Sequence, residues 1–402
     1  MLGRILWLAA LLLGLPAAAV AASQGLNQLK AGAVDTSPHY KELHMAPSSC
    51  VAPCIDYALS AELENDWVFA ATPPSLRSND LYPTLESAII LTPLSHVRLI
   101  GDFIFEPVKD PPPGRSTAFA DLGAYVDQLY LEVEYGAFNL QAGKIHPSFG
   151  QAWDVAPGLH ATDIPGNYEL EERIGIGAAY EFDALGLDNV LQASLFTTDR
   201  TVLSGSIFTH RPRTRLSDGG AGNTAGVSSV SMTLDGCVGG APVDCYADGE
   251  LGYNLGARFQ RPGEGDTAGE LGFVAGANKT LIFDDMTVRL FGEVAFFRNF
   301  EGSRDDALFL TASTELDIDA ISCSLAYTLQ QNLSGGSNQL VELAAGYDLG
   351  EAFSLVGEEW SIAVGYSFNR NEGQDTHLIG IHFTVDLNGS LPSTTAARRQ
   401  RY

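Results

Sequence analysis

The chain has 402 residues, and its 49 acidic residues outnumber 23 lysines and arginines, which gives a net charge of −26 at pH 7. This charge argues against a nucleic-acid partner, because phosphates would be repelled. Beyond residue 22 the sequence holds no run of 18 apolar residues, which excludes a helical membrane protein. No linker or low-complexity tract divides the chain, so one folded domain is predicted.

The first 22 residues have the organisation of a secretory signal. Arg4 supplies a positive charge, Ile5 to Leu15 form an apolar stretch too short for a bilayer, and Ala19 to Ala22 include the small residues that cleavage requires. An N-terminal membrane anchor is the alternative, and the alanine run favours cleavage. Residues 1–22 are therefore expected to be a signal peptide, and the mature chain to be exported.

Residues 57–387 are predicted to form a β-barrel, because apolar and polar residues alternate there in segments of about ten. In Gln128 to Tyr135, for example, Leu129, Leu131 and Val133 alternate with polar residues. Aromatic residues near strand ends match the girdles at membrane interfaces. A soluble β-sandwich also alternates, but at this length it would need several linked domains. The fold class predicted is all-β, a transmembrane antiparallel barrel.

Short and long connections alternate along the chain, as expected for periplasmic turns and external loops. On this basis we count sixteen strands, within a range of 14 to 18, with both ends periplasmic. Val202 to Thr209 is assigned to an external loop, because one more strand there would break the parity. The strands are predicted to begin near Tyr57, Tyr82, Val97, Ala124, Phe138, Arg173, Asp188, Val227, Gly249, Glu270, Met286, Ala307, Ala320, Gln339, Glu359 and Asp375.

Four of the five cysteines form two close pairs. Cys50 and Cys54 lie in residues 23–56, an N-terminal segment expected to be periplasmic or a plug, and Cys237 and Cys245 flank a Gly/Pro-rich stretch. In an exported protein each pair is a candidate disulfide. No histidine has zinc-ligand spacing to them, so no metal site is expected.

A short motif carries a resemblance to a known family. The segment from Leu140 to Gly150, LQAGKIHPSFG, is similar to the G-K-x-x-P-x-F-G motif of phosphate-selective and siderophore-type outer-membrane porins of Gram-negative bacteria. The segment from Thr209 to Asn223 resembles a loop of porin-like proteins of alphaproteobacteria. The resemblance implies an outer-membrane channel, in contact with lipid and lipopolysaccharide and, by analogy with porins, a homotrimer.

The C-terminal end resembles the signal that the barrel assembly machinery reads. Gly380 to Val385 matches part of it, whereas Leu378 stands where a polar residue is usual. Residues 388–402 follow as a Ser/Thr/Arg-rich tail that is predicted to be disordered.

A barrel of about sixteen strands is wide enough for an aqueous channel, whose selectivity depends on inward-facing charges. The acids predicted to face inward are Asp102, Glu106, Glu132, Glu134, Glu181, Glu293, Glu315 and Glu342. The bases are Arg98, Arg173, Arg258 and Arg289. Acids exceed bases two to one, which predicts a modest cation preference.

A basic cluster in the external stretch after Thr198 could reverse that preference. Arg211, Arg213 and Arg215 would attract phosphate or carboxylates if this loop folded into the pore, as a constriction loop. Left outside, the same side chains would meet lipopolysaccharide phosphates. Both readings stay open at this point.

The function predicted is passive diffusion of small hydrophilic solutes or ions through an outer-membrane porin, without a cofactor. The alternative is an anion-selective channel that uses the basic loop. GxSxG, HExxH, P-loop and CxxCH motifs are absent and the eight histidines are scattered, so no enzyme and no catalytic residue is expected. A structural or conduit barrel and an outer-membrane hydrolase are the weaker alternatives.

Overall fold

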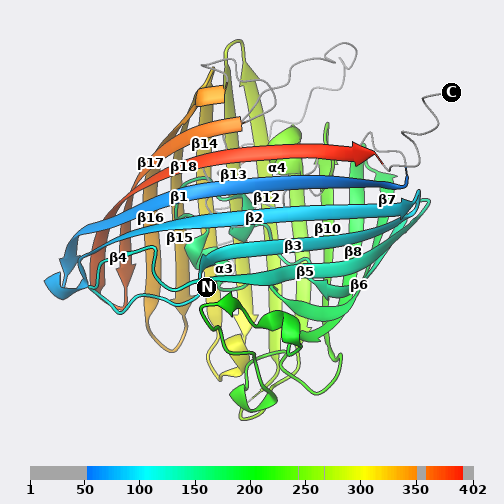
Figure 1. Cartoon of the computed structure of the whole chain (residues 1–402), viewed down its shortest axis with the longest axis horizontal. Coiled ribbons are helices and arrows are strands. Elements are labelled where there is room, and N and C mark those ends of the chain that lie inside the picture. Colours follow the sequence, from blue (N-terminus) through cyan, green and yellow to red (C-terminus); the bar gives the residue numbers. More distant parts are fainter. Residues whose placement is uncertain (1–51, 243, 267, 351–358, 393–402) are drawn as a thin grey trace. The chain divides into compact units, whose positions relative to one another are not determined.

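The computed structural model describes residues 52–242, 244–266, 268–350 and 359–392, and within them the strands close into a barrel (Figure 1). Two of the eighteen strands, β4 (Thr117–Ala118) and β9 (Ile207–Phe208), have only two residues, which leaves sixteen long strands. The barrel closes because β1 (Cys54–Thr72) pairs with both β2 (Ser78–Leu94) and β18 (Gln374–Pro392), all antiparallel. The predicted fold class and strand number are confirmed.

Each long strand begins within four residues of its predicted position, because the alternation and the turn residues are both local signals. The remaining long strands are β3 (Val97–Pro107), β5 (Leu122–Tyr135), β6 (Phe138–Ile145), β7 (Arg173–Ala184), β8 (Leu187–Thr198), β10 (Ser229–Val238), β11 (Leu251–Gln260), β12 (Glu270–Phe283), β13 (Met286–Arg298), β14 (Ala307–Ile318), β15 (Ile321–Asn332), β16 (Ser337–Asp348) and β17 (Glu359–Asn371).

Helical structure is limited to single turns. The α-helical turns are α2 (Ala152–Val155), α3 (Asp163–Gly166) and α4 (Cys245–Asp248), and the 3₁₀ turns are η1 (Pro74–Leu76), η2 (Val202–Ser204), η3 (Leu216–Asp218) and η4 (Phe300–Gly302). In the described part of the chain no helix has the length and apolar character needed to cross a membrane.

The outer face of the barrel is a band of exposed apolar side chains. On β1, for example, Leu63 and Trp67 are 43% and 51% exposed, whereas Glu64 between them is fully buried. The same alternation recurs on the other strands, since pleated side chains point to opposite faces. Apolar exposure on this scale is unfavourable in water and favourable in lipid, so the outer face is the membrane-facing surface.

Short turns join the strands at one end of the barrel. The β5–β6 and β7–β8 turns each contain a glycine with positive φ, Gly136 at +62° and Gly186 at +77°. The longest connections, residues 146–172 and 199–228, lie at the other end. Only Ile207–Phe208 of the second connection forms a strand, and it pairs with β5, so its assignment to a loop is confirmed.

The last strand is longer than predicted. Residues 388–392, which we expected to belong to a disordered tail, continue β18 and pair with β1 as far as Cys54 and Pro392. The long partner strand β1 supplies the hydrogen bonds that extend β18, and the polar composition of the segment does not reveal this. The rest of the tail and the predicted signal peptide lie outside the described residues.

A disulfide bond joins Cys237 and Cys245, as predicted. It holds α4 against the inner wall, where the Tyr246 hydroxyl donates to Glu315 at 3.2 Å and its ring meets Phe291 edge-on. Cys50 lies outside the described residues, so the Cys50–Cys54 bond stays a prediction. Cys323 is a free thiol.

Replacing Cys237 and Cys245 together by serine is expected to lower the free energy of unfolding by about 2–3 kcal/mol without loss of the barrel. The bond closes a loop with a sequence separation of 8, and constraining a loop of that length in the unfolded chain contributes about this much. Urea unfolding in detergent measures the change. Cys323→Ser is the matched control, and an equal loss in that variant would contradict the assignment.

Candidate functional site

Residues 146–172, which connect β6 to β7 and are called the inward loop below, fold into the barrel. Phe149, Leu159 and Tyr168 of this loop are almost completely buried. Phe149 and Tyr168 pack on Phe297 of β13, with ring centroids 5.7 and 5.8 Å apart, and Tyr168 also meets Phe309 of β14. An apolar core inside the barrel therefore fixes the loop against one side of the wall.

Glu293 on β13 anchors the first part of the inward loop. Its Oε2 accepts from the Gln151 N–H at 2.7 Å, and its Oε1 accepts from the Ala152 N–H at 3.1 Å and from the Tyr168 hydroxyl. Burial and the neighbouring Glu293 carboxylate raise the pKa of Tyr168 well above its usual value, so the phenol stays a neutral donor. This predicted lumen acid is buried under the loop.

Glu342 on β16 anchors the tip of the inward loop in the same way. Its Oε1 accepts from the Leu159 N–H at 2.8 Å and its Oε2 from the His160 N–H at 2.9 Å. Gly158, with φ at +141°, precedes this contact, and a Cβ atom there would lie 2.4 Å from Glu342 Oε2. The backbone can approach the carboxylate only because residue 158 is glycine.

The porin-like motif forms the entrance of the inward loop. Gly143 has φ at +147°, and a Cβ atom there would lie 2.4 Å from the Leu129 carbonyl oxygen. Lys144 is buried, and its ammonium donates to Glu172 at 2.7 Å and to the Val126 carbonyl at 2.6 Å. The motif residues thus direct the chain from the wall into the interior.

The predicted inward bases are held in ion pairs or hydrogen bonds. Buried Arg258 donates to Glu270 at 2.8 Å, and its guanidinium lies 4.6 Å from the ring centroids of Phe149 and Phe297. Arg289 pairs with Glu315 and Asp317, Arg173 donates to Thr198, and Arg98 pairs with Glu132 and Glu134.

The other predicted acids lie at inward positions of the strands. Asp102 and Glu106 are on β3, Glu106 accepts from the Tyr125 hydroxyl at 2.5 Å, and Glu181 is exposed near the β7–β8 turn. Glu315 is buried beside Arg289.

Further acids on β1 and β2 escaped the sequence reasoning. Glu62, Glu64 and Asp66 alternate along the inner face of β1, and Glu86 lies on the same face of the neighbouring strand β2. Their spacing of two residues on β1 is the signal that could have revealed them.

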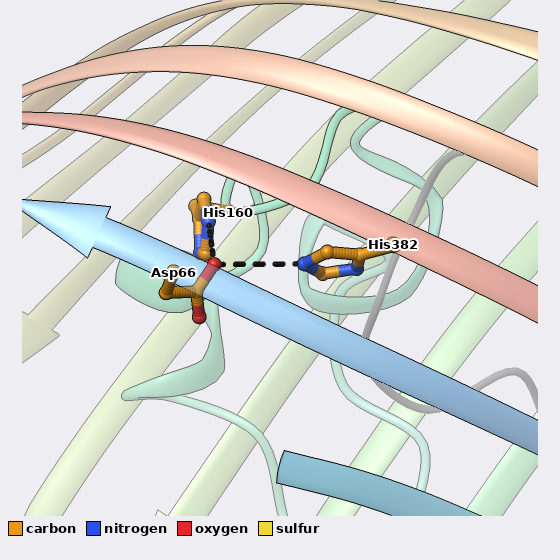
Figure 2. A group of neighbouring side chains, drawn as sticks. All are labelled: Asp66, His160 and His382. Atoms are coloured by element: carbon orange, nitrogen blue, oxygen red, sulfur yellow. Dashed lines mark ion pairs between the residues drawn. The ribbon is translucent and has the colours of Figure 1, made fainter. Parts of the chain in front are cut away.

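Two histidines meet Asp66 where the inward loop reaches β1 and β18 (Figure 2). His160 Nε2 lies 3.2 Å and His382 Nε2 3.6 Å from Asp66 Oδ1. Burial opposes protonation of His160, but Asp66, with Asp163 and Glu342, raises its pKa to about 10. The residues come from three distant parts of the sequence, so no local motif marks the cluster.

The basic loop lies at the mouth of the barrel. Arg211 donates to both carboxylate oxygens of Glu172, at 2.7 and 2.9 Å, and its guanidinium lies 4.0 Å above the ring of Tyr125, an inward residue of β5. Arg213 and Arg215 line a pocket of about 430 Å³ together with Arg200 and His210. The structure therefore brings the predicted cluster together, with Arg211 on the inner side.

Comparisons with solved structures support the fold. OpdK, an outer-membrane protein of Pseudomonas aeruginosa, aligns with a TM-score of 0.51 at 10% identity over 85% of this chain and all of its own. The outer-membrane channel DcaP of Acinetobacter baumannii aligns with a TM-score of 0.49 at 11% identity, over 83% of this chain and 97% of its own. No protein-family model and no curated protein matches the sequence.

The closed sixteen-stranded barrel and its apolar outer face define a membrane-spanning β-barrel, and its fold is similar to that of OpdK. The resemblance to outer-membrane barrels is thereby confirmed at the level of the fold. A phosphate-selective or siderophore subtype has no such support.

Replacing Glu293 by alanine is expected to destabilise the protein by about 1–3 kcal/mol and to loosen the inward loop, because two buried donors and one half-buried donor lose their acceptor. Unfolding in detergent measures the first effect, and larger, noisier single-channel currents report the second. Glu181→Ala removes an exposed inward acid and serves as control. Unchanged currents in the Glu293 variant would contradict the anchoring role.

Proposed function

We propose that the protein is a passive diffusion channel for small hydrophilic solutes or ions, with a modest preference for cations. A barrel of sixteen strands is wide enough to leave a water-filled path, and a loop folded inward narrows it. The inward loop packs on β13 and β16 through Glu293 and Glu342. The path is proposed to run between this loop and the wall formed by β1, β2, β3 and β5.

The charge of that wall is the observation that carries the proposal. Its inward positions hold one base, Arg98, among the residues that the structure describes. Eight acids at inward positions of the same wall are called the acidic wall: Glu62, Glu64, Asp66, Glu86, Asp102, Glu106, Glu132 and Glu134. Asp56, Asp80 and Asp127 also lie on these strands and are held by Ser390, Thr117 and His146. Arg98 is paired with Glu132 and Glu134, and Asp66 and Glu64 lie against His160 and His382. The remaining acids, Glu62, Glu86, Asp102 and Glu106, are proposed to set the sign of the local potential.

A field of one sign inside a low-dielectric wall concentrates counter-ions and repels ions of like charge. The buried bases on the other side, Arg258 and Arg289, are already neutralised by Glu270 and Glu315. Cations are therefore expected to be enriched along the acidic wall.

Changing Glu86 to Gln and Asp102 to Asn together is expected to lower the cation-to-anion permeability ratio by a factor of about two. Reversal potentials across a planar bilayer in a salt gradient measure the ratio. Asp284→Asn with Asp285→Asn removes the same charge from an exposed turn and should leave the ratio unchanged. A wild-type ratio of one or less would refute the cation preference, and the absence of any current would refute the channel.

Selective passage of anions is the second candidate, and the pocket at the barrel mouth favours it. Arg200, His210, Arg213 and Arg215 line this pocket, and no acid is among its described lining residues. A guanidinium pair binds phosphate or carboxylate well. Anions could be captured there before they enter the barrel.

On this second candidate, inorganic phosphate should reduce the single-channel current of the wild type, and Arg213→Ala with Arg215→Ala should raise the half-blocking concentration about tenfold. Lys109→Ala with Arg115→Ala removes two exposed bases from another connection and is the control. Equal block in both double variants would exclude the pocket as a binding site.

A homotrimer and contacts with lipopolysaccharide stay predictions.

A further inference from the structure

Three side-chain atoms converge where the tip of the inward loop meets the seam between β1 and β18, and a fourth lies beside them. Asp66 Oδ1 lies 3.2 Å from His160 Nε2 and 3.6 Å from His382 Nε2, and His382 Nε2 lies 3.8 Å from Glu64 Oε2 (Figure 2 shows the first three residues). Glu64 and Asp66 come from β1, His382 from β18 and His160 from the inward loop. The set is two imidazoles and two carboxylates.

All four atoms are buried, and apart from their ion-pair contacts with one another none makes a hydrogen bond within the described residues. Glu64 is fully buried, His382 is 3% exposed and His160 is 8% exposed. Leaving buried polar atoms unpaired costs about 1–3 kcal/mol for each group, and more for charged groups. Three such atoms close together, with the Glu64 oxygen beside them, indicate that something else binds between them.

The spacing of Asp66, His160 and His382 fits part of a metal coordination shell, since one ligand atom from each lies within 4.8 Å of the other two. Zinc binds histidine nitrogen and carboxylate oxygen at about 2.0–2.2 Å in a tetrahedron, which places neighbouring ligand atoms about 3.3–3.6 Å apart. The separations of 3.2 and 3.6 Å between Asp66 and the two imidazoles lie close to that range. Glu64 Oε2, 3.8 Å from His382 Nε2, lies beside these three atoms.

The other atoms of these side chains are already held by neighbours. The Thr84 hydroxyl donates to Glu64 Oε1 at 2.5 Å, and the Tyr82 hydroxyl donates to Asp66 Oδ2 at 2.8 Å. Such bonds orient each carboxylate so that its remaining oxygen points at the histidines. Asp163 lies 3.7 Å from His160 Nδ1, where ligating histidines commonly meet a carboxylate.

We propose that Asp66, His160 and His382, with Glu64 beside them, form a binding site for a divalent transition-metal ion of the zinc class. Imidazole nitrogen suits such ions, whereas calcium and magnesium favour sites built from oxygen alone. The two carboxylates balance the two positive charges of the ion. Since His160 belongs to the inward loop and the other ligands to the wall, the bound ion would fasten the loop tip to the seam between β1 and β18.

The test uses the full-length mature protein, folded in detergent and stripped with a chelator, with Zn²⁺ alone as the probe. Titration with metal analysis by mass spectrometry is expected to give one zinc per chain that a tenfold excess of Mg²⁺ or Ca²⁺ does not displace. X-ray absorption at the zinc edge should show nitrogen and oxygen neighbours with the scattering of two imidazoles. Because absorption is read on the unaltered protein, it stays decisive if a variant fails to fold.

His160→Ala and His382→Ala are each expected to weaken zinc binding at least about tenfold, since loss even of a supporting residue costs that much. His377→Ala is the matched control, because it removes another histidine of β18 whose ring stacks on Tyr366. Substoichiometric zinc in the wild type, absorption without imidazole scattering, or equal affinity in His160→Ala and His377→Ala would overturn the proposal. A channel that conducts but binds no zinc would refute the metal site alone.

Discussion

The interior of this barrel depends on buried carboxylates that accept hydrogen bonds from the backbone of the inward loop. The loop contains only single helical turns, so its N–H groups need acceptors from elsewhere. Glu293 supplies acceptors to the first part of the loop, at Gln151 and Ala152. Glu342 supplies acceptors to its tip, at Leu159 and His160. These charge-assisted bonds place Phe149 in the inner core and His160 at the far wall.

Strands were predictable from the sequence because their signals are local. Side-chain parity already placed Glu293 and Glu342 on the inner face, and the structure agrees. What parity cannot reveal is the partner: the Gln151 N–H that Glu293 accepts lies 142 residues away in the chain. Burial of these acids results from a loop that enters from another strand pair, which strand periodicity does not encode.

The same limit applies to the bases of the lumen. Arg258 and Arg289 face inward as predicted, but ion pairs with Glu270 and Glu315 remove them as free charges. Counting inward-facing charges from the sequence therefore overestimates the electrostatic effect of residues that are paired in the structure. The acids on β1 are held in the same way: Asp66 faces His160 and His382, and Glu62 accepts from the Thr384 hydroxyl.

His160 connects the carboxylate anchor of the inward loop with the acidic inner face of β1. Its backbone N–H donates to Glu342, while its imidazole faces Asp66 on β1. Because Glu342 and Gly158 already fix the backbone, the imidazole is positioned before any ligand arrives, and binding there costs little further ordering. On the proposed metal site, a cation held by Asp66 and His160 would fasten the tip of the inward loop to β1, because Glu342 holds the backbone of the same residue.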